Sequence, residues 1–229
     1  MSAQSDFIEE VSKIDREGLS HFSEYLTEKT DFFTAPASTK FHGAVEGGLL
    51  LHSLTVLDIM RLLDDSLDLK LDKDSITICG LFHDVCKFNF YQIDDEEATP
   101  PQIKYAQDLC DQHSIKMPPR VERTKAYLSI VINELKLGHK VFPPYKPSYK
   151  VVDQLPMGHG EKSVYVLSKF FSLKDEEALA IRWNLGGFDP GVNFMYPSGA
   201  PQKQAFRESK LVSLLVAADI SASYLVDTW

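Results

Sequence analysis

The chain has 229 residues, of which 44% are hydrophobic and 25% are charged, a composition typical of a globular protein with one substantial core. No apolar run approaches the length of a membrane span, and the first residues lack the basic start and apolar stretch of a secretory signal. The net charge of -9 argues against long nucleic acid and favours a small substrate, although net charge does not exclude a local basic groove.

The first elements predicted along the chain are two helices joined by a loop. Apolar residues recur at helical spacing from Ser5 to Thr30, which we interpret as a packing helix. Asp31 to Gly48 is interrupted by proline and glycine and is predicted to be a loop. Its His42 is either a substrate contact or a surface residue. Leu49 to Leu67 predicts a second helix, with His52 one turn in on the apolar face.

A third predicted helix begins at Asp74 or Ser75, either of which can cap it, and it carries the pair His83 and Asp84 near its end. Lys87 follows three residues after Asp84. A lysine at this place is favoured by the dipole at the helix C-terminus, and it is equally suited to hold a substrate phosphate. The sequence leaves these two interpretations open.

The middle of the chain carries fewer signals. Residues 89–120 are polar and interrupted by proline, and their acidic stretch 94–97 is interpreted as a solvated loop. Residues 121–137 are predicted to be helical. The segment 138–156 is rich in proline and tyrosine, and we interpret it as a lid or wall over the site. The three cysteines are few and odd in number, which predicts reduced thiols and a cytoplasmic protein.

The glycines around His159 open a helix that is predicted to run to Phe171. A glycine-rich helix start leaves backbone N–H groups free to bind an anion, and Lys162 in the first turn would add a donor. The alternative is that Gly160 serves only as a helix cap. A further helix starts at residues 174–177 and ends near Arg182, followed by two glycines.

The last predicted helix runs from Lys203 to Leu225 and carries Asp219 among small residues. No strand-like alternation of useful length occurs. The sequence therefore predicts an all-α fold, a helical bundle of about seven helices in a single domain, residues 1–229. Residues 1–32 would form an N-terminal packing helix, and residues 33–226 the core, with an insertion near 138–156.

Four ionisable residues lie in apolar surroundings: His52, His83, Asp84 and Asp219. Burying such groups is costly unless something pairs with them, and a divalent metal accepts both imidazole and carboxylate ligands. Because consecutive helical residues diverge by about 100°, His83 and Asp84 can grip one ion only at the edge of their helix. The other ligands must then come from other helices. We predict that all four converge on one metal.

These four positions, in this order, resemble the HD-domain metal-dependent phosphohydrolases, in which a His, a later His-Asp pair and a distant Asp recur. Similar HD modules occur at the C-terminus of some bacterial exoribonucleases and in some conjugative relaxases. The closer resemblance is to the small bacterial and phage HD hydrolases, which share further strings with this chain. The strings are Pro36–Gly43, Gly47-Gly48-Leu49 and Gly158-His159-Gly160-Glu161-Lys162-Ser163. The resemblance covers about Phe33 to Leu225 and implies an all-α HD domain.

The resemblance also implies a function. The ligand set suits Mn²⁺, Fe²⁺, Co²⁺, Ni²⁺ or Zn²⁺, and Mg²⁺ less well. Asp84 would be both ligand and orienter of the attacking water, with Lys87 and His159 as further catalytic residues. Substrate contacts would come from His42, Lys162 and Arg182. We expect hydrolysis of a phosphomonoester or phosphodiester, such as a nucleotide. A nuclease acting on RNA or DNA and a non-catalytic module that binds metal and nucleotide are the alternatives.

Asn184 departs from the family pattern. In the related small HD hydrolases the matching segment, Ile181–Gly186, usually has His at this position. Some HD enzymes use such extra histidines to hold a second metal, and an amide oxygen is a weaker ligand for transition metals than imidazole. The sequence therefore predicts one tightly held metal, with His159 left for substrate or a supporting contact. The substrate, the native metal and the oligomeric state are not determined by the sequence.

Overall fold

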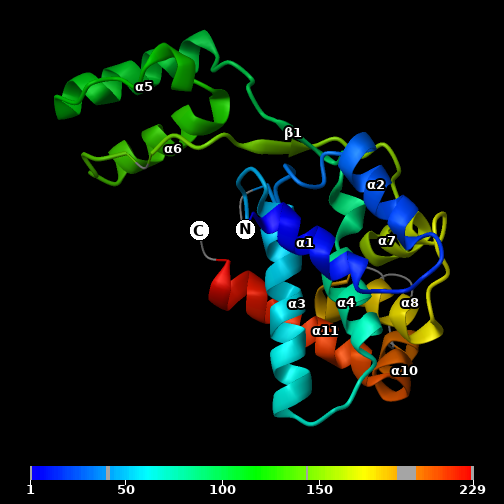
Figure 1. Cartoon of the computed structure of the whole chain (residues 1–229). Helices are drawn as coiled ribbons and strands as arrows, with labels where there is room; N and C mark the ends of the chain where they lie inside the picture. The colour runs from blue at the N-terminus through cyan, green and yellow to red at the C-terminus, as the bar shows by residue number, and fades with distance from the viewer. Residues whose placement is uncertain (1, 40–41, 143, 190–199, 228–229) are drawn as a thin grey trace. The chain divides into compact units, whose positions relative to one another are not determined.

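The computed structural model describes residues 2–39, 42–142, 144–189 and 200–227, and within them it has ten α-helices and one two-stranded sheet (Figure 1). The predicted all-α class is confirmed, with more helices than predicted. The chain divides into two compact units: unit 1 comprises Met1–Tyr91 and Val152–Trp229, and unit 2 comprises Gln92–Val151. Unit 2 begins far upstream of the insertion predicted near 138–156. That residues 1–229 act as one domain stays a prediction.

Unit 1 contains eight of the described helices. Their bounds are α1 Ala3–Ser12, α2 Leu19–Lys29, α3 Gly48–Ser66, α4 Lys73–Phe82, α7 His159–Leu167, α8 Asp175–Arg182, α10 Ala200–Glu208 and α11 Lys210–Ser221. Short 3₁₀ turns follow α4 at Val85–Lys87 and α8 at Gly186–Phe188.

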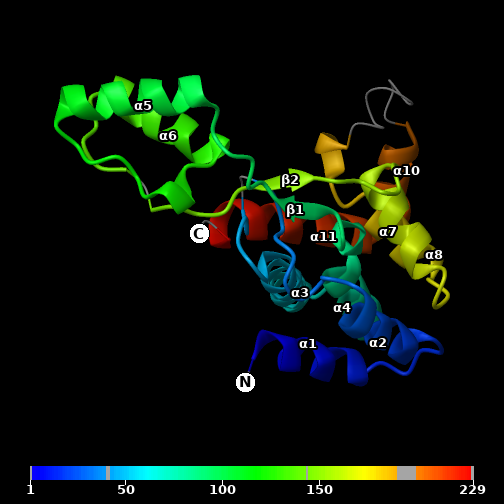
Figure 2. The same cartoon turned by 90° about the horizontal axis from the view of Figure 1, so that it is seen from above.

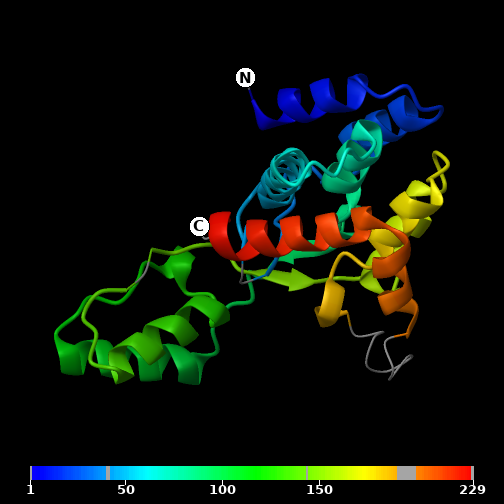
Figure 3. The same ribbon diagram turned by 90° about the horizontal axis from the view of Figure 1, so that it is seen from below.

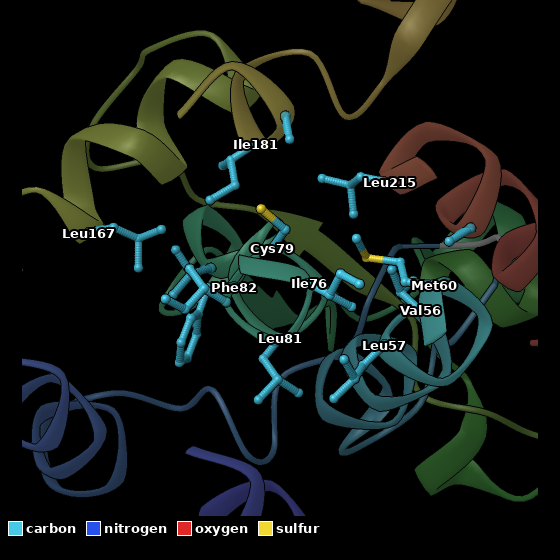
Figure 4. Packing of buried hydrophobic residues seen from close by; sticks show 14 of the residues in the cluster. Val56, Leu57, Met60, Ile76, Cys79, Leu81, Phe82, Leu167, Ile181 and Leu215 are labelled. Atoms are coloured by element: carbon cyan, nitrogen blue, oxygen red, sulfur yellow. The ribbon is translucent and has the colours of Figure 1, made fainter. Parts of the chain in front are cut away.

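The centre of unit 1 is the pair α3 and α4, which pack closely on each other. Gly80 makes this possible, because a Cβ at that position would lie 2.8 Å from the Cα of Leu57 on α3. Figure 4 shows side chains of α3 and α4 meeting Ile181 of α8 and Leu215 of α11 in one buried cluster. Removal of these apolar surfaces from water, at about 25 cal/mol per Å², is the main force that holds the helices together.

The N-terminal prediction of one helix from Ser5 to Thr30 is wrong, because the chain turns between α1 and α2. Gly18 adopts a φ of 85°, a left-handed conformation that glycine tolerates and other residues rarely do. Phe7 on α1 and Phe22 on α2 are fully buried. Both helices are therefore packing elements, as predicted, but the helical spacing of apolar residues continued across the break and concealed it.

The predicted helix from Lys203 to Leu225 is likewise two helices, α10 and α11. Ser209 has extended backbone, and its side chain caps α11 by accepting a hydrogen bond from the backbone N–H of Leu211 at 3.2 Å. After Ser221 the chain continues as a π-helical turn, Ala222–Val226. Figure 3 shows this C-terminal helical run in red, and α11 packs against α3, α4 and α8.

Helix α4 begins one or two residues earlier than predicted, at Lys73, and ends just before the His-Asp pair. The side chain of Asp72 caps it, accepting from the backbone N–H of Ser75 at 2.8 Å. The last α-helical residue is Phe82, so His83 is the C-cap and Asp84 begins the turn that follows.

Unit 2 contains two helices, α5 (Pro100–His113) and α6 (Lys125–Lys136), that lie side by side (Figure 2). Strands β1 (Tyr91–Ile93) and β2 (Tyr149–Val151) pair where the chain enters and leaves the unit. Cys110 and Leu128 belong to its own apolar cluster. The sequence interpretation missed α5, although Thr99 and Pro100 form a good helix start, with Thr99 as cap.

Within the described ranges, no single helix is long and apolar enough to cross a membrane. A bent pair, Pro201–Glu208 with Lys210–Val226, passes the same test by length and composition only.

Candidate metal centre

The structure brings together the four residues predicted to bind a metal, all within unit 1. His52 Nε2 lies 3.2 Å from Asp219 Oδ1 and 3.8 Å from Asp84 Oδ2. His83 Nε2 lies 3.7 Å from the same Asp84 oxygen. His52, His83 and Asp84 each present one ligand atom within 4.8 Å of the others, a spacing that fits one ion. Asp219 stands beside this trio rather than within it.

The end of α4 explains how two consecutive residues reach one point. His83 keeps helical backbone angles, but Asp84 does not, with φ −102° and ψ 12°. The pair was predicted to lie inside the helix, where consecutive side chains diverge by about 100°. Leaving the helix at Asp84 frees its carboxylate to turn back toward the imidazole of its neighbour.

The surroundings of His83 keep its imidazole neutral, with Nε2 unprotonated. Its Nδ1 lies 2.9 Å from the carbonyl oxygen of Gly80, which can only accept a hydrogen bond, so Nδ1 carries the proton and Nε2 the lone pair. Complete burial lowers the pKa of His83, which keeps the ring uncharged. Its Nε2 has no hydrogen-bond partner among the described residues.

The Nε2 atom of His52 is likewise buried without a hydrogen-bond partner among the described residues. This atom has no directed hydrogen bond, because Asp219, although 3.2 Å away, is not aligned for one. Burial lowers the pKa of His52, but the carboxylates of Asp219 and Asp227 outweigh it and raise the pKa to about 9. Two buried, unpartnered imidazole nitrogens beside two carboxylates fit a divalent metal, which would take the place of the proton.

Asp84 is the most connected residue of the cluster. Lys87 Nζ lies 2.5 Å from its Oδ2, and His159 Nε2 lies 2.6 Å from its Oδ1. Burial raises the pKa of Asp84, but the positive charges of Lys87 and the nearby histidines lower it well below the usual range. The carboxylate is therefore ionised and able to bind a cation.

His159 joins the site from the start of α7. Its Nδ1 lies 3.2 Å from Cys86 Sγ, and the Nδ2 of Asn184 lies 3.4 Å from its Nε2. Burial lowers the pKa of His159, but the influence of Cys86 and Asp84 raises it to about 10. Asn184 thus stands where the sequence interpretation expected a partner of His159, and its buried Oδ1 has no hydrogen-bond partner in the described structure.

A cavity of about 420 Å³ opens onto these groups. It is lined by His42, Asp84, Lys87, Asn184, Leu185, Phe188, Asp219, Ile220, Ser223 and Tyr224. The predicted loop residue His42 is half-buried, with its ring centroid 4.9 Å from that of His52. Burial, and then the charges of His52 and Lys87, lower the pKa of His42 to about 4, so this ring is neutral. Lys40 and Phe41 of the same string lie outside the described residues.

Two predicted substrate residues, Lys162 and Arg182, do not line this cavity, and their substrate roles stay predictions. Lys162 Nζ is 2.5 Å from Asp153 Oδ1 and does not line the cavity. Arg182 pairs with Asp189 at 2.7 Å and with Glu161, in a separate groove between α7 and α8. Both cationic side chains form ion pairs with acidic residues, and the sequence interpretation did not predict these pairs.

The glycine-rich start of α7 also has a packing role. A Cβ on Gly160 would lie 2.1 Å from the carbonyl oxygen of Arg182, so this glycine allows α7 to approach the end of α8. Neither the predicted anion seat nor the alternative, a simple helix cap, accounts for that contact.

The sequence interpretation missed Asp227. This residue is fully buried, and its Oδ2 lies 2.7 Å from His52 Nδ1. It falls one residue beyond the predicted core, in a stretch with no recognised motif, so no signal in the sequence pointed to it.

Comparison with known proteins agrees with this geometry. A family model for the HD domain matches residues 49–130, a range that includes His52, His83 and Asp84 and ends before Asp219. The chain contains an HD domain. HD proteins are typically metal-dependent hydrolases, and the cluster at His52, His83 and Asp84 can hold a metal. No match is found among curated proteins or among solved structures.

Proposed function

We propose that this HD protein is a metal-dependent phosphohydrolase that hydrolyses a phosphomonoester or phosphodiester bond of a nucleotide. The observation that carries the proposal is the pair of buried Nε2 atoms of His52 and His83, which make no hydrogen bond among the described residues and face the carboxylate of Asp84. When bound there, a divalent metal would polarise a phosphoryl group and activate water. His52, His83, Asp84 and Asp219 would hold it.

The surrounding residues of the chain have roles that do not depend on the metal. Lys87 keeps Asp84 ionised and places a positive charge at the cavity, where it would offset charge developing on phosphoryl oxygens. His159 bonds to the other oxygen of Asp84 and restrains its orientation. His42, neutral and lining the cavity, is available to hydrogen-bond substrate.

The cavity supports the nucleotide part of the proposal. Beside its charged residues it is lined by two aromatic side chains that are mostly exposed, Phe188 at 70% and Tyr224 at 68%. Solvent-exposed aromatic rings next to a phosphate-handling site suit a ligand with a flat base, and one stacked base contributes about 1–3 kcal/mol. A cavity of about 420 Å³ is also of the size that binds small ligands.

The test is a panel of substrates given to metal-stripped protein, with each divalent ion added in turn. Phosphate release from mononucleotides supports the proposal, and shortening of an oligonucleotide supports a nuclease. Binding without turnover under every metal supports a non-catalytic module. His83→Ala should remove the metal-dependent activity, whereas His139→Ala, which changes an exposed histidine of unit 2, should not.

The base contact has its own test. Phe188→Ala and Tyr224→Ala should raise KM for a nucleotide about tenfold, the lower part of the range for a lost stacking contact. Neither change should affect a sugar phosphate that lacks a base. Equal effects on both substrates would contradict a base-binding role and leave the phosphohydrolase proposal intact.

A further inference from the structure

The C-terminal end of α11 has an irregular winding that bears on the metal centre. The five residues Ala222–Val226 form a π-helical turn, closed by the backbone N–H of Asp227 donating to the carbonyl oxygen of Ala222 at 2.8 Å. Hydrogen bonds between residues five apart are rare in proteins, and they occur mostly in single π-helical turns, often at functional sites.

This turn explains how one helical run brings two carboxylates to one imidazole. Asp219 and Asp227 are eight residues apart, and in a regular α-helix they would point about 80° away from each other. A π turn rotates less per residue, which reduces that offset. As a result Asp219 Oδ1 lies 3.2 Å from Nε2 of His52, and Asp227 Oδ2 lies 2.7 Å from Nδ1 of the same ring.

The two carboxylates compete for the proton of a neutral His52. A carboxylate can only accept, so Asp227 favours the tautomer with the proton on Nδ1 and the lone pair on Nε2. Asp219 next to Nε2 favours the opposite tautomer, in which Nε2 is protonated and cannot bind a metal. The contact to Asp227 is the shorter one and has hydrogen-bonding geometry, whereas the contact to Asp219 does not.

We propose that Asp227 is a positioning residue that fixes His52 as an Nε2 metal ligand, with the π turn as the feature that delivers it. This inference rests on the metal centre of the proposed function. His83 obtains the same tautomer from a backbone carbonyl, that of Gly80, which no side-chain substitution removes. Asp227 is fully buried, and its second oxygen has no hydrogen-bond partner within the described chain. Burying an unsatisfied carboxylate oxygen costs free energy, which a residue that only ends a helix could avoid.

The experiment measures metal affinity in full-length protein, stripped of metal and titrated calorimetrically with Mn²⁺ or Zn²⁺. Asp227→Ala should bind about 10–100-fold more weakly, the usual loss when a partner of a ligating histidine is removed. Asp227→Asn should lose less, because an amide oxygen can still accept from Nδ1. The matched control is Asp64→Ala, a buried carboxylate on the same helix as His52 that accepts from the backbone N–H of Leu71.

A second readout separates positioning from stability. Nitrogen-15 spectra of the zinc-loaded protein should show His52 bound through Nε2 in the wild type and a mixture of ring states in Asp227→Ala. Wild-type affinity in Asp227→Ala would overturn the inference, as would an equal loss in Asp64→Ala that follows the melting temperature. If Asp227→Ala does not fold, a wild-type affinity in Asp227→Asn together with a mixed His52 ring state would do the same.

These outcomes are distinct from failure of the proposed function. A wild-type protein that binds metal but hydrolyses no phosphate ester removes the catalytic claim and leaves the role of Asp227 standing. A wild-type protein that binds no divalent metal overturns both.

Discussion

Two buried polar clusters described in unit 1 differ in how completely their polar atoms are hydrogen-bonded. In the first, Glu177 is fully buried and its carboxylate is fully engaged. Arg16 donates to both of its oxygens at 2.8 and 2.9 Å, and the hydroxyl of Ser75 donates at 2.8 Å. The backbone N–H of Lys174 adds a further bond at 2.8 Å.

The second cluster is the candidate metal centre, and its buried polar atoms are less completely hydrogen-bonded. Among the described residues five buried side-chain atoms lack a hydrogen-bond partner. Four of them belong to the centre, on His52, His83, Asn184 and Asp227. Buried polar groups that serve only stability are normally hydrogen-bonded, so this contrast favours a structural role for the first cluster and a binding role for the second.

The largest effect that tests the contrast is expected from Asp84→Ala. Loss of this carboxylate removes a ligand and the partner of both Lys87 and His159, so metal-dependent hydrolysis should fall by about 10³-fold or more. Circular dichroism should show that the fold persists. Full activity in this variant would place the chemistry elsewhere.

Glu177→Gln should have the reverse signature, a loss of stability with an intact metal centre. Breaking a buried ion pair by removing one partner typically costs about 3–5 kcal/mol of unfolding free energy. Urea unfolding measures this loss, and calorimetric titration should show unchanged metal affinity. A fall in metal affinity equal to that of Asp84→Ala would mean that the two clusters are not separable.

Lys87→Ala should lower catalytic efficiency by about 10²-fold, the usual loss when one donor to a developing oxyanion is removed. Metal content should hold, because Lys87 is not itself one of the four candidate ligands, although its Nζ contacts Oδ2, the Asp84 oxygen that faces His52 and His83. Elemental analysis beside steady-state kinetics checks both. Lost metal with unchanged efficiency per bound ion would make Lys87 structural.

The stability difference between wild type and Glu177→Gln should depend on pH. Burial raises the pKa of Glu177, but Arg16 and the other donors lower it below its ordinary value of 4.5. A group with a depressed folded-state pKa contributes fully above its unfolded value, and the contribution is lost as pH falls through the folded value. The two proteins should therefore converge in stability below pH 4.5 and stay apart above it.

The smallest effect is expected from Asn184→His. The wild type should bind one ion, because an amide is a poor ligand for transition metals, and the imidazole should add a second site beside His159. Elemental analysis of both proteins measures the stoichiometry. Two fully occupied ions in the wild type would refute the single-metal prediction.

Much of the fold could be predicted, since α3, α4 and α8 have apolar periodicity and recognisable ends. The breaks at Gly18 and Ser209 could not, because apolar spacing remains helical across both positions. A single residue in a left-handed or extended conformation redirects the chain without altering that pattern.

The candidate site divides in the same way. His52, His83, Asp84 and Asp219 were identified by type and order, and the structure brings them together. Lys162 was expected at the substrate, but its partner Asp153 lies in a loop that no periodicity connects to it. Asp227 depends on a π turn, because regular helical spacing would point it about 80° away from Asp219.

Gly80 has one more consequence, concerning the distance between two of the candidate ligands. The near-contact of this residue with the backbone of Leu57 sets the gap between the helix that carries His52 and the helix that leads into His83. A single methyl group there would push the two helices apart and increase the distance between His52 and His83, although neither residue would be changed. The distance between two of the candidate ligands thus depends partly on a side chain that consists of one hydrogen atom.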